Sequence, residues 1–237
     1  MIYRYPDFVC AVTTFEPFAT MRFELLERTV RSMRVAFPDD ALFIFDNGSA
    51  DGSHDAVAQL AESTGALLVS RYKHLPNRTP GAARACLFEH FLRIRNGNEI
   101  AVLSDDDMVW HPDARKRLRE VWHHAPDKLQ IVGGLLEPEW EWNKPIEAVD
   151  VGSERILLRE SAPGAAWTLP ISRMIRCCGG RIEPVFGYDV KMCKWLRAMD
   201  FDIGQMDLAD HIGWEGSTHG NRAIEHAMPL DRKRWGV

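Results

Sequence analysis

Continuous apolar runs alternate with segments of helical spacing through the first half of the chain. The apolar runs predict buried strands, and they span residues 8–14, 41–45, 66–70 and 99–104. The segments between them predict helices, at 20–37, 53–64 and 81–95. This alternation predicts an α/β protein whose single central sheet is mostly parallel and carries helices on both faces.

The second half of the chain is less regular. It predicts helices at 111–124 and 190–199 and strands at 130–136, 156–158 and 167–169. Neither an internal repeat nor a linker long enough to divide the chain is present. We therefore expect one domain over residues 1–237, with a first half at 1–110 and a second half at 111–237.

Composition narrows the class of protein. The 237 residues are 46% hydrophobic and 27% charged, and no apolar stretch approaches the ~20 residues that span a bilayer. The five cysteines form no CxxC pair and the N-terminus lacks a signal-peptide pattern, so a reducing, cytoplasmic location is expected. A net charge of −5 disfavours a dedicated nucleic-acid binder, although the tail 231–235 is locally basic.

Polar clusters follow three of the predicted strands. Thr13 and Thr14 end the first, Asp46 ends the second, and the triplet Asp105 to Asp107 ends the fourth. Ligands of open α/β sheets bind outside the carboxyl ends of the strands, so these clusters predict a site at one edge.

Three consecutive carboxylates repel each other unless a positive group lies among them. A hard divalent cation such as Mg²⁺ or Mn²⁺ is the candidate, because carboxylates that hold it often bind a diphosphate through it. In an extended segment Asp105 and Asp107 would point the same way. Simpler interpretations are a helix N-cap before Pro112 for one of these aspartates, and an Asx-turn for Asp46.

Five motifs in order resemble one known family, the inverting nucleotide-sugar glycosyltransferases of family 2 with the GT-A fold. They are Asp46-Asn47-Gly48-Ser49 with Asp51-Gly52-Ser53, Gly81-Ala82-Ala83-Arg84, Asp105-Asp106-Asp107, Gly187-Tyr188-Asp189 and the segment from His211 to Ser217. Two positions depart from the family pattern: Ala85 stands where Asn is usual, and Tyr188 takes the place of a Glu. The resemblance implies a nucleotide-sugar-binding half at 1–110 and an acceptor-binding and catalytic half at 111–237.

The resemblance also implies roles on the donor side. Asp107 would bind the metal, Mn²⁺ or Mg²⁺, and Asp105 or Asp106 would contact ribose or metal-bound water. Asp46 would accept an N–H of the nucleobase. Further donor contacts are expected from Thr13, Thr14, Glu16 and Arg84, the last as a partner of the diphosphate unless it is simply an exposed side chain.

On the acceptor side the resemblance makes Asp189 the general base, with a helix N-cap as its competing role. His211 would be a further metal ligand, and His219 is the alternative. Aromatic rings stack on sugar faces, so an acceptor platform is expected from Trp140, Trp142 and Trp214, whereas Trp167 is expected in the core.

The expected activity is metal-dependent transfer of a sugar from a nucleoside diphosphate donor, with UDP favoured, to a hydroxyl of a saccharide, a lipid-linked compound or another acceptor. A nucleotidyltransferase is disfavoured, because the residues after the first strand, Thr13 to Pro17, lack a Gly-rich basic loop. Two alternatives stay open: a glycosyltransferase acting on a modified pyrimidine of DNA, and a non-catalytic nucleotide-sugar binding module.

Overall fold

The computed structural model describes residues 8–70, 80–94, 99–135, 145–172 and 188–212. The strands are β1 (Phe8–Thr14), β2 (Ala41–Asp46), β3 (Leu67–Ser70), β4 (Ile100–Asp105), β5 (Met108–Trp110), β6 (Leu129–Gly133), β7 (Glu147–Val151), β8 (Glu154–Arg159), β9 (Ala166–Pro170), β10 (Asp202–Gln205) and β11 (Ala209–His211). The helices are α1 (Phe23–Ala36), α2 (His54–Thr64), α3 (Pro80–Ile94), α4 (Ala114–His124) and α6 (Tyr188–Ala198). None of these helices is long and apolar enough to cross a membrane.

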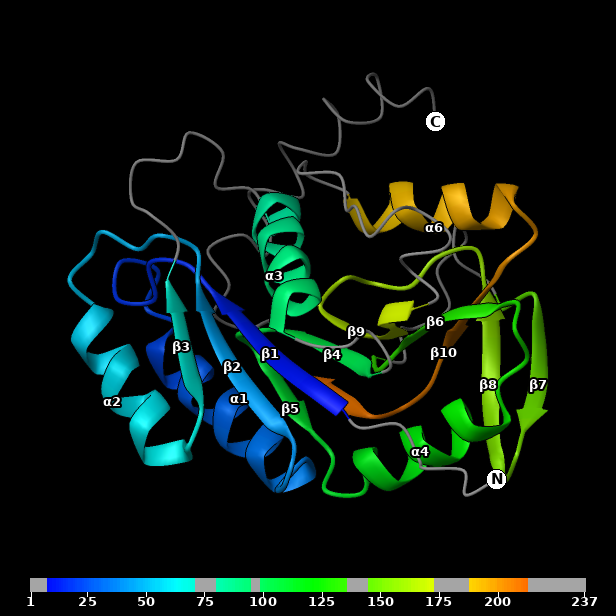
Figure 1. Cartoon of the computed structure of the whole chain (residues 1–237), viewed down its shortest axis with the longest axis horizontal. Helices are drawn as coiled ribbons and strands as arrows, with labels where there is room; N and C mark the ends of the chain where they lie inside the picture. Colours follow the sequence, from blue (N-terminus) through cyan, green and yellow to red (C-terminus); the bar gives the residue numbers. More distant parts are fainter. Residues whose placement is uncertain (1–7, 71–79, 95–98, 136–144, 173–187, 213–237) are drawn as a thin grey trace.

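Nine strands form the central sheet in the order β3-β2-β1-β4-β9-β6-β10-β8-β7 (Figure 1). Strands β9 and β8 run antiparallel to their neighbours, and the remaining strands share one direction. The predicted mostly parallel sheet is therefore confirmed. A separate two-stranded sheet pairs β5 with β11.

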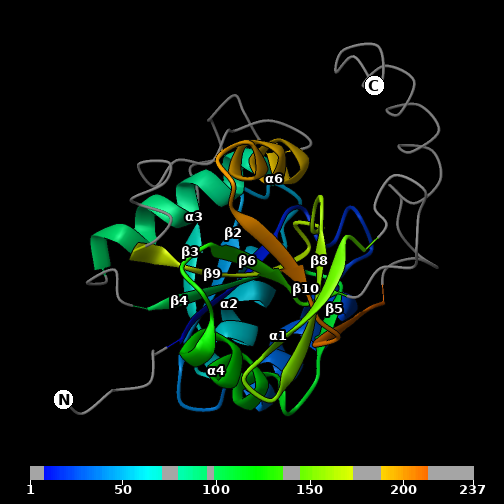
Figure 2. The same cartoon turned by 90° about the vertical axis from the view of Figure 1, so that its right-hand side faces the viewer.

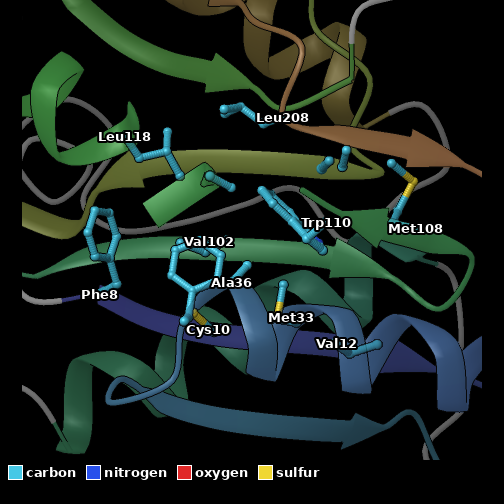
Figure 3. Packing of buried hydrophobic residues seen from close by; sticks show 14 of the residues in the cluster. Phe8, Cys10, Val12, Met33, Ala36, Val102, Met108, Trp110, Leu118 and Leu208 are labelled. Atoms are coloured by element: carbon cyan, nitrogen blue, oxygen red, sulfur yellow. The ribbon is translucent and has the colours of Figure 1, made fainter. Parts of the chain in front are cut away.

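The sheet is buried on both faces, and strand β1 shows why its sequence is continuously apolar. Phe8, Cys10 and Val12 pack with helices α1, α2 and α4, whereas Val9 and Ala11 pack with α3 and α6. The alternation follows from the two-residue period of a strand. Figure 2 shows α3 and α6 on one side of the sheet and α1 and α4 on the other. Figure 3 shows the hydrophobic cluster on the α1 and α4 side, which includes Phe8, Cys10 and Val12.

The sequence pattern did not predict four of the strands, namely β5, β7, β10 and β11. Three of them have only three or four residues, and β7 lies at the sheet edge with partly exposed side chains. Helix α1 also begins three residues later than predicted. The amide and hydroxyl of Thr20 both donate to the Glu16 carbonyl, and Met21 has a φ of 55°, so the chain turns before it becomes helical.

Candidate active site

Strand β1 brings the three predicted polar clusters together. It lies between β2 and β4, and the registers pair Thr14 with Asp46 and Thr13 with Asp105. All three strands end at the same sheet edge. The expectation that these side chains gather there is confirmed.

The chain turns at Asp106 and Asp107 instead of staying extended. The extended geometry in which Asp105 and Asp107 were expected to point the same way is therefore not the one observed. Asp106 and Asp107 instead share a partner, the Arg22 guanidinium, whose Nη2 lies 2.5 Å from Oδ1 of Asp106 and 2.6 Å from Oδ2 of Asp107. Nε of Arg22 also donates to Oδ1 of Asp106 at 2.9 Å, and the Thr14 hydroxyl donates to Oδ2 at 2.8 Å.

Asp105 has a different cationic partner. Nη2 of Arg84 lies 2.6 Å from its Oδ1, and the Arg84 side chain is only 1% exposed. Nε of Arg84 also donates to the Tyr188 hydroxyl at 3.3 Å, and Nη2 lies 3.3 Å from the Gly164 carbonyl. Arg84 is thus not the exposed arginine that the simpler interpretation expected. The guanidinium is already paired with Asp105 inside the protein, and its contact with a diphosphate stays a prediction.

The strand pair β5–β11 places His211 beside Asp107. The register pairs His211 with Met108, and the Ile212 amide donates to the Asp107 carbonyl at 2.8 Å. Nε2 of His211 then lies 3.1 Å from Oδ2 of Asp107. The structure brings together these two predicted metal ligands, which are distant in the sequence.

The three carboxylates differ in their electrostatics. Loss of hydration raises the pKa of Asp105 to about 6, the other two carboxylates add to this rise, and Arg84 opposes it. Burial also raises the pKa of Asp106, against the charge of Arg22. Burial alone would raise the pKa of Asp107 as well, but the hydrogen bond with His211 and the charge of Arg22 lower it overall. Asp107 is therefore the carboxylate whose ionised form its surroundings favour.

The donor set of Asp107 and His211 fits a divalent metal in part. A carboxylate oxygen and an imidazole nitrogen are ligands that Mn²⁺ accepts, and these two atoms face each other at contact distance. No group of three or more His, Cys, Asp or Glu side chains within the described ranges is arranged to hold a metal. A metal here would complete its coordination with diphosphate oxygens or water, as Mg²⁺ commonly does.

Asp46 is the last residue of β2, and its side chain is only 4% exposed. Its Oδ1 accepts hydrogen bonds from the Ser49 amide at 2.9 Å and from the Ser49 hydroxyl at 2.6 Å. One oxygen thus organises the turn, but through Ser49, three residues on, whereas the expected Asx-turn would bond the amide two residues on. The other, Oδ2, lies 3.9 Å from His54 Nδ1, and nucleobase binding by Asp46 stays a prediction.

The 46–53 turn also holds the loop after β1. Ser49 Oγ accepts the Glu16 amide at 2.8 Å. Oδ2 of Asp51 accepts the amides of Phe18 and Ala19 at 2.7 and 3.0 Å. These bonds fix the backbone that leads into Arg22.

Asp189 is the second residue of α6, not the residue before it, because the helix begins two residues earlier than predicted; Asp189 is therefore not its N-cap. Its Oδ2 accepts the Gly164 amide at 3.0 Å, and its Oδ1 accepts the Val190 amide at 2.9 Å. The neighbouring Tyr188 hydroxyl lies 3.3 Å from the Gly164 carbonyl. Asp189 is thereby connected through Gly164 and Tyr188 to Arg84 and the acidic triplet.

Some predicted residues cannot be placed. Trp140, Trp142, Trp214 and His219 lie outside the described residues. Trp167 is fully buried, which confirms its assignment to the core.

Two residues of this site were missed from the sequence, Arg22 and Gly164. Repulsion among the three carboxylates of the triplet requires a positive group, and from the sequence only a metal ion was considered for that role. Arg22 is the basic residue nearest to the end of β1, and this position was an available signal. Gly164 carried no comparable signal.

Comparison with known families gives one match. Residues 18–176 match the sequence model described as Glycosyl transferase family 2. That segment contains the end of the β1 loop, the Asp46 turn, Arg84 and the acidic triplet. A comparison with curated proteins finds no match.

Solved structures with a similar fold include glycosyltransferases and a glucosyl-3-phosphoglycerate synthase. A mannosyltransferase from Pyrobaculum calidifontis, solved with GDP-Man and Mn²⁺, is 16% identical in sequence and superposes with a TM-score of 0.57. The match covers 86% of this chain and 58% of the mannosyltransferase chain. TarS of S. aureus is 10% identical with a TM-score of 0.58, over 89% and 61%. Glucosyl-3-phosphoglycerate synthase of Mycobacterium tuberculosis, solved with Mn²⁺ and UDP, is 16% identical with a TM-score of 0.54, over 98% and 81%. The chain spans about three fifths of the first two structures, and the likeness establishes the GT-A fold.

Proposed function

Because the chain belongs to glycosyl transferase family 2, we propose that it transfers a sugar from a UDP-linked donor to an acceptor hydroxyl, with inversion and with a divalent metal. The observation that carries the proposal is the meeting of Asp107 and His211 beside the Asp105–Arg84 pair at the sheet edge. Acidic oxygens, an imidazole and two arginines at this edge suit a diphosphate and its counter-ion.

Asp107 and His211 are the residues that would hold Mn²⁺ or Mg²⁺. A metal bound there would neutralise charge on the departing diphosphate. The assignment rests on the placement of the two side chains, since Oδ2 of Asp107 and Nε2 of His211 lie 3.1 Å apart. Thr14 supports the site indirectly, since its hydroxyl orients Asp106.

Asp189 is the proposed general base. It would take the proton of the acceptor hydroxyl while the acceptor oxygen forms a bond to the anomeric carbon and the bond from that carbon to the diphosphate oxygen breaks. Attack opposite the leaving group inverts the anomeric centre. Each Asp189 oxygen accepts one backbone N–H in the described contacts, and a carboxylate oxygen has a further lone pair for the incoming hydroxyl.

The nucleotide would lie over the ends of β1 and β2. Asp46 would accept a base N–H through Oδ2, and Thr13, Thr14 and Glu16 would line the ribose side. The structural neighbours were solved with GDP-Man, UDP-GlcNAc or UDP, so both nucleotides must be tested. UDP is favoured here because a single carboxylate suits the N3–H of uracil.

A donor screen tests the proposal. Thermal unfolding is measured with UDP, GDP and their sugars, each with Mn²⁺ and with EDTA. We expect a rise in the unfolding midpoint with UDP or a UDP-sugar that depends on Mn²⁺, because a ligand bound only by the folded state stabilises it. No shift with any nucleotide in Mn²⁺ would contradict the proposal.

Turnover separates the open alternatives. A UDP-sugar that binds without ever being consumed, across saccharide and lipid-linked acceptors, would favour a binding module. Binding of DNA at low salt that weakens as salt rises would favour a nucleobase acceptor. For an active pair of substrates, the anomeric configuration of the product, determined by NMR, tests inversion.

A further inference from the structure

Arg22 occupies the position of a counter-ion at the acidic triplet. Its Nη2 lies within 2.6 Å of carboxylate oxygens of both Asp106 and Asp107, and its side chain is only 15% exposed. Burial disfavours the charged guanidinium, but the two carboxylates outweigh burial and raise the pKa of Arg22 overall. Arg22 therefore stays positively charged between them.

The contact with Asp107 lies where a metal would bind. Oδ2 of Asp107 is shared between Nη2 of Arg22 at 2.6 Å and Nε2 of His211 at 3.1 Å. A cation that bridges Asp107 and His211 would approach the same oxygen, and two positive charges a few ångströms apart repel each other. The guanidinium and the metal therefore compete for this oxygen.

Asp106 provides an anchor about which Arg22 can move. Nε and Nη2 of Arg22 both donate to Oδ1 of Asp106, whereas Asp107 receives Nη2 alone. The Arg22 backbone is fixed, because its amide donates to the Pro17 carbonyl at 2.8 Å and its carbonyl accepts the Leu26 amide at 2.9 Å. A side-chain rotation could release Asp107 while keeping Asp106, with no change of the backbone.

We propose that Arg22 is the internal counter-ion of the acidic triplet, and that divalent metal displaces its guanidinium from Asp107 towards the diphosphate of the donor. This inference rests on the proposed donor and metal site. Without nucleotide, Arg22 weakens metal binding by competition. With nucleotide, the displaced guanidinium gains a phosphate partner, so metal and nucleotide each strengthen the binding of the other. Arg22 is a positioning residue that couples the two ligands.

The test measures Mn²⁺ affinity from the EPR signal of free Mn²⁺, with and without UDP, in the full chain. The variants are Arg22→Gln and the control Arg31→Gln, which removes an exposed arginine paired with Glu27 on the same helix. We expect Arg22→Gln to tighten Mn²⁺ binding without UDP by about fivefold or more, and to reduce the factor by which UDP strengthens it. Arg31→Gln should match the parent protein.

An unchanged or weaker Mn²⁺ affinity of Arg22→Gln without UDP would overturn the inference. If that variant does not fold, Arg22→Lys decides, because lysine lacks the Nε donor that anchors Arg22 to Asp106, and its ammonium, on a shorter side chain, should hold Asp107 less closely and compete less. Tighter Mn²⁺ binding by Arg22→Lys than by the parent supports the inference, and equal binding overturns it.

The two proposals fail differently. If Mn²⁺ and UDP bind the parent protein but Arg22→Gln changes neither affinity nor coupling, only the role of Arg22 is wrong. If UDP binds no variant while Arg22→Gln still tightens Mn²⁺, competition at Asp107 stands and the nucleotide-sugar site fails.

Discussion

Arg84 and Asp105 form an ion pair in which the arginine is buried and the aspartate is partly exposed to solvent. Their closest atoms, Nη2 and Oδ1, are 2.6 Å apart, and the side chains are 1% and 43% exposed. The cation thus lies inside the protein while its carboxylate partner reaches the edge where the donor is proposed to bind. The buried charge depends on Asp105, because its other described partners, Tyr188 and Gly164, are neutral.

Asp105→Asn should lower the free energy of unfolding by about 1–3 kcal/mol, because it leaves the Arg84 cation buried without a carboxylate. The half-open position of Asp105 keeps the loss below that of a fully enclosed pair. The control is Asp150→Asn, which breaks the exposed pair of Asp150 with Arg155 and should cost less than about 1 kcal/mol. Urea unfolding checks both, and equal losses would contradict the buried-charge argument.

Asp107→Asn should abolish the stimulation of donor turnover by Mn²⁺ while the protein stays folded, because the proposed metal loses its ionised ligand. His211→Gln should weaken the Mn²⁺ response, since an amide replaces the imidazole nitrogen. The measurement is the initial rate against Mn²⁺ concentration. Asp210→Asn, at the exposed neighbour of His211 on β11, is the control and should leave the curve unchanged. Full stimulation in Asp107→Asn would remove the metal assignment.

The sequence carried enough information to place the strand ends. Buried parallel strands need continuous apolar runs, which made these strands recognisable. Once the strands are parallel, the polar residues at their carboxyl ends must lie at one edge of the sheet. Asp46 and the acidic triplet could be predicted together for this reason.

The role of Arg22 could not be predicted in the same way. Its contact with Asp106 spans 84 positions in the sequence, and it depends on a loop in which Glu16 and Met21 have φ values of 48° and 55°. Non-glycine residues rarely adopt this left-handed conformation, and no periodic pattern indicates it. The contact of Gly164 with Tyr188 likewise depends on how β9 and α6 are packed, which short-range patterns do not specify.

Gly164→Ala should reduce sugar transfer. A β-carbon at this position would lie 2.3 Å from the Tyr188 hydroxyl oxygen and 3.2 Å from the Asp189 β-carbon, so either Tyr188 or the Gly164 backbone that is hydrogen-bonded to Asp189 must shift. The shift displaces the proposed base, and misplacement of a catalytic group by about 1 Å can lower the rate by about 100-fold. UDP affinity, measured beside turnover, should change far less.

Gly65→Ala is the matched control for that variant. Gly65 ends α2 with a φ of 64° and has no atom within 4 Å of an added β-carbon. The substitution should cost roughly 1–2 kcal/mol of stability through backbone strain alone, and leave kcat unchanged. If both variants lowered kcat in proportion to their loss of stability, the placement of Asp189 by Gly164 would be wrong.

Asp189→Asn should lower kcat by about 100-fold to 10,000-fold, the range for loss of a general base, while UDP binding is retained. The amide keeps one oxygen that can accept the Gly164 N–H, so the start of α6 should stay in place. Single-turnover rates and UDP affinity measured on the same preparation separate the two effects. Equal losses in both would identify Asp189 as a structural residue of the helix start.

Asp51 organises the backbone that presents Arg22. Its carboxylate accepts the amides of Phe18 and Ala19 through Oδ2, and the amide and hydroxyl of Ser53 through Oδ1. Burial alone would raise the pKa of Asp51, but these hydrogen bonds lower it overall. The folded protein therefore holds this carboxylate ionised to a lower pH than the unfolded chain does.

A depressed pKa makes the contribution of Asp51 to stability depend on pH. It is present above the unfolded value of about 3.9, and it is lost as pH falls through the lower pKa of the folded state. Asp51→Asn should therefore cost about 1 kcal/mol at pH 6, and the difference from the parent should shrink below about pH 4. The control is Asp39→Asn, at an exposed aspartate of the α1–β2 turn, which should change the free energy of unfolding at pH 6 by less than about 0.5 kcal/mol. Denaturant unfolding across this pH range checks both variants, and a difference for Asp51→Asn that stays constant with pH would show that its charge does not hold the loop.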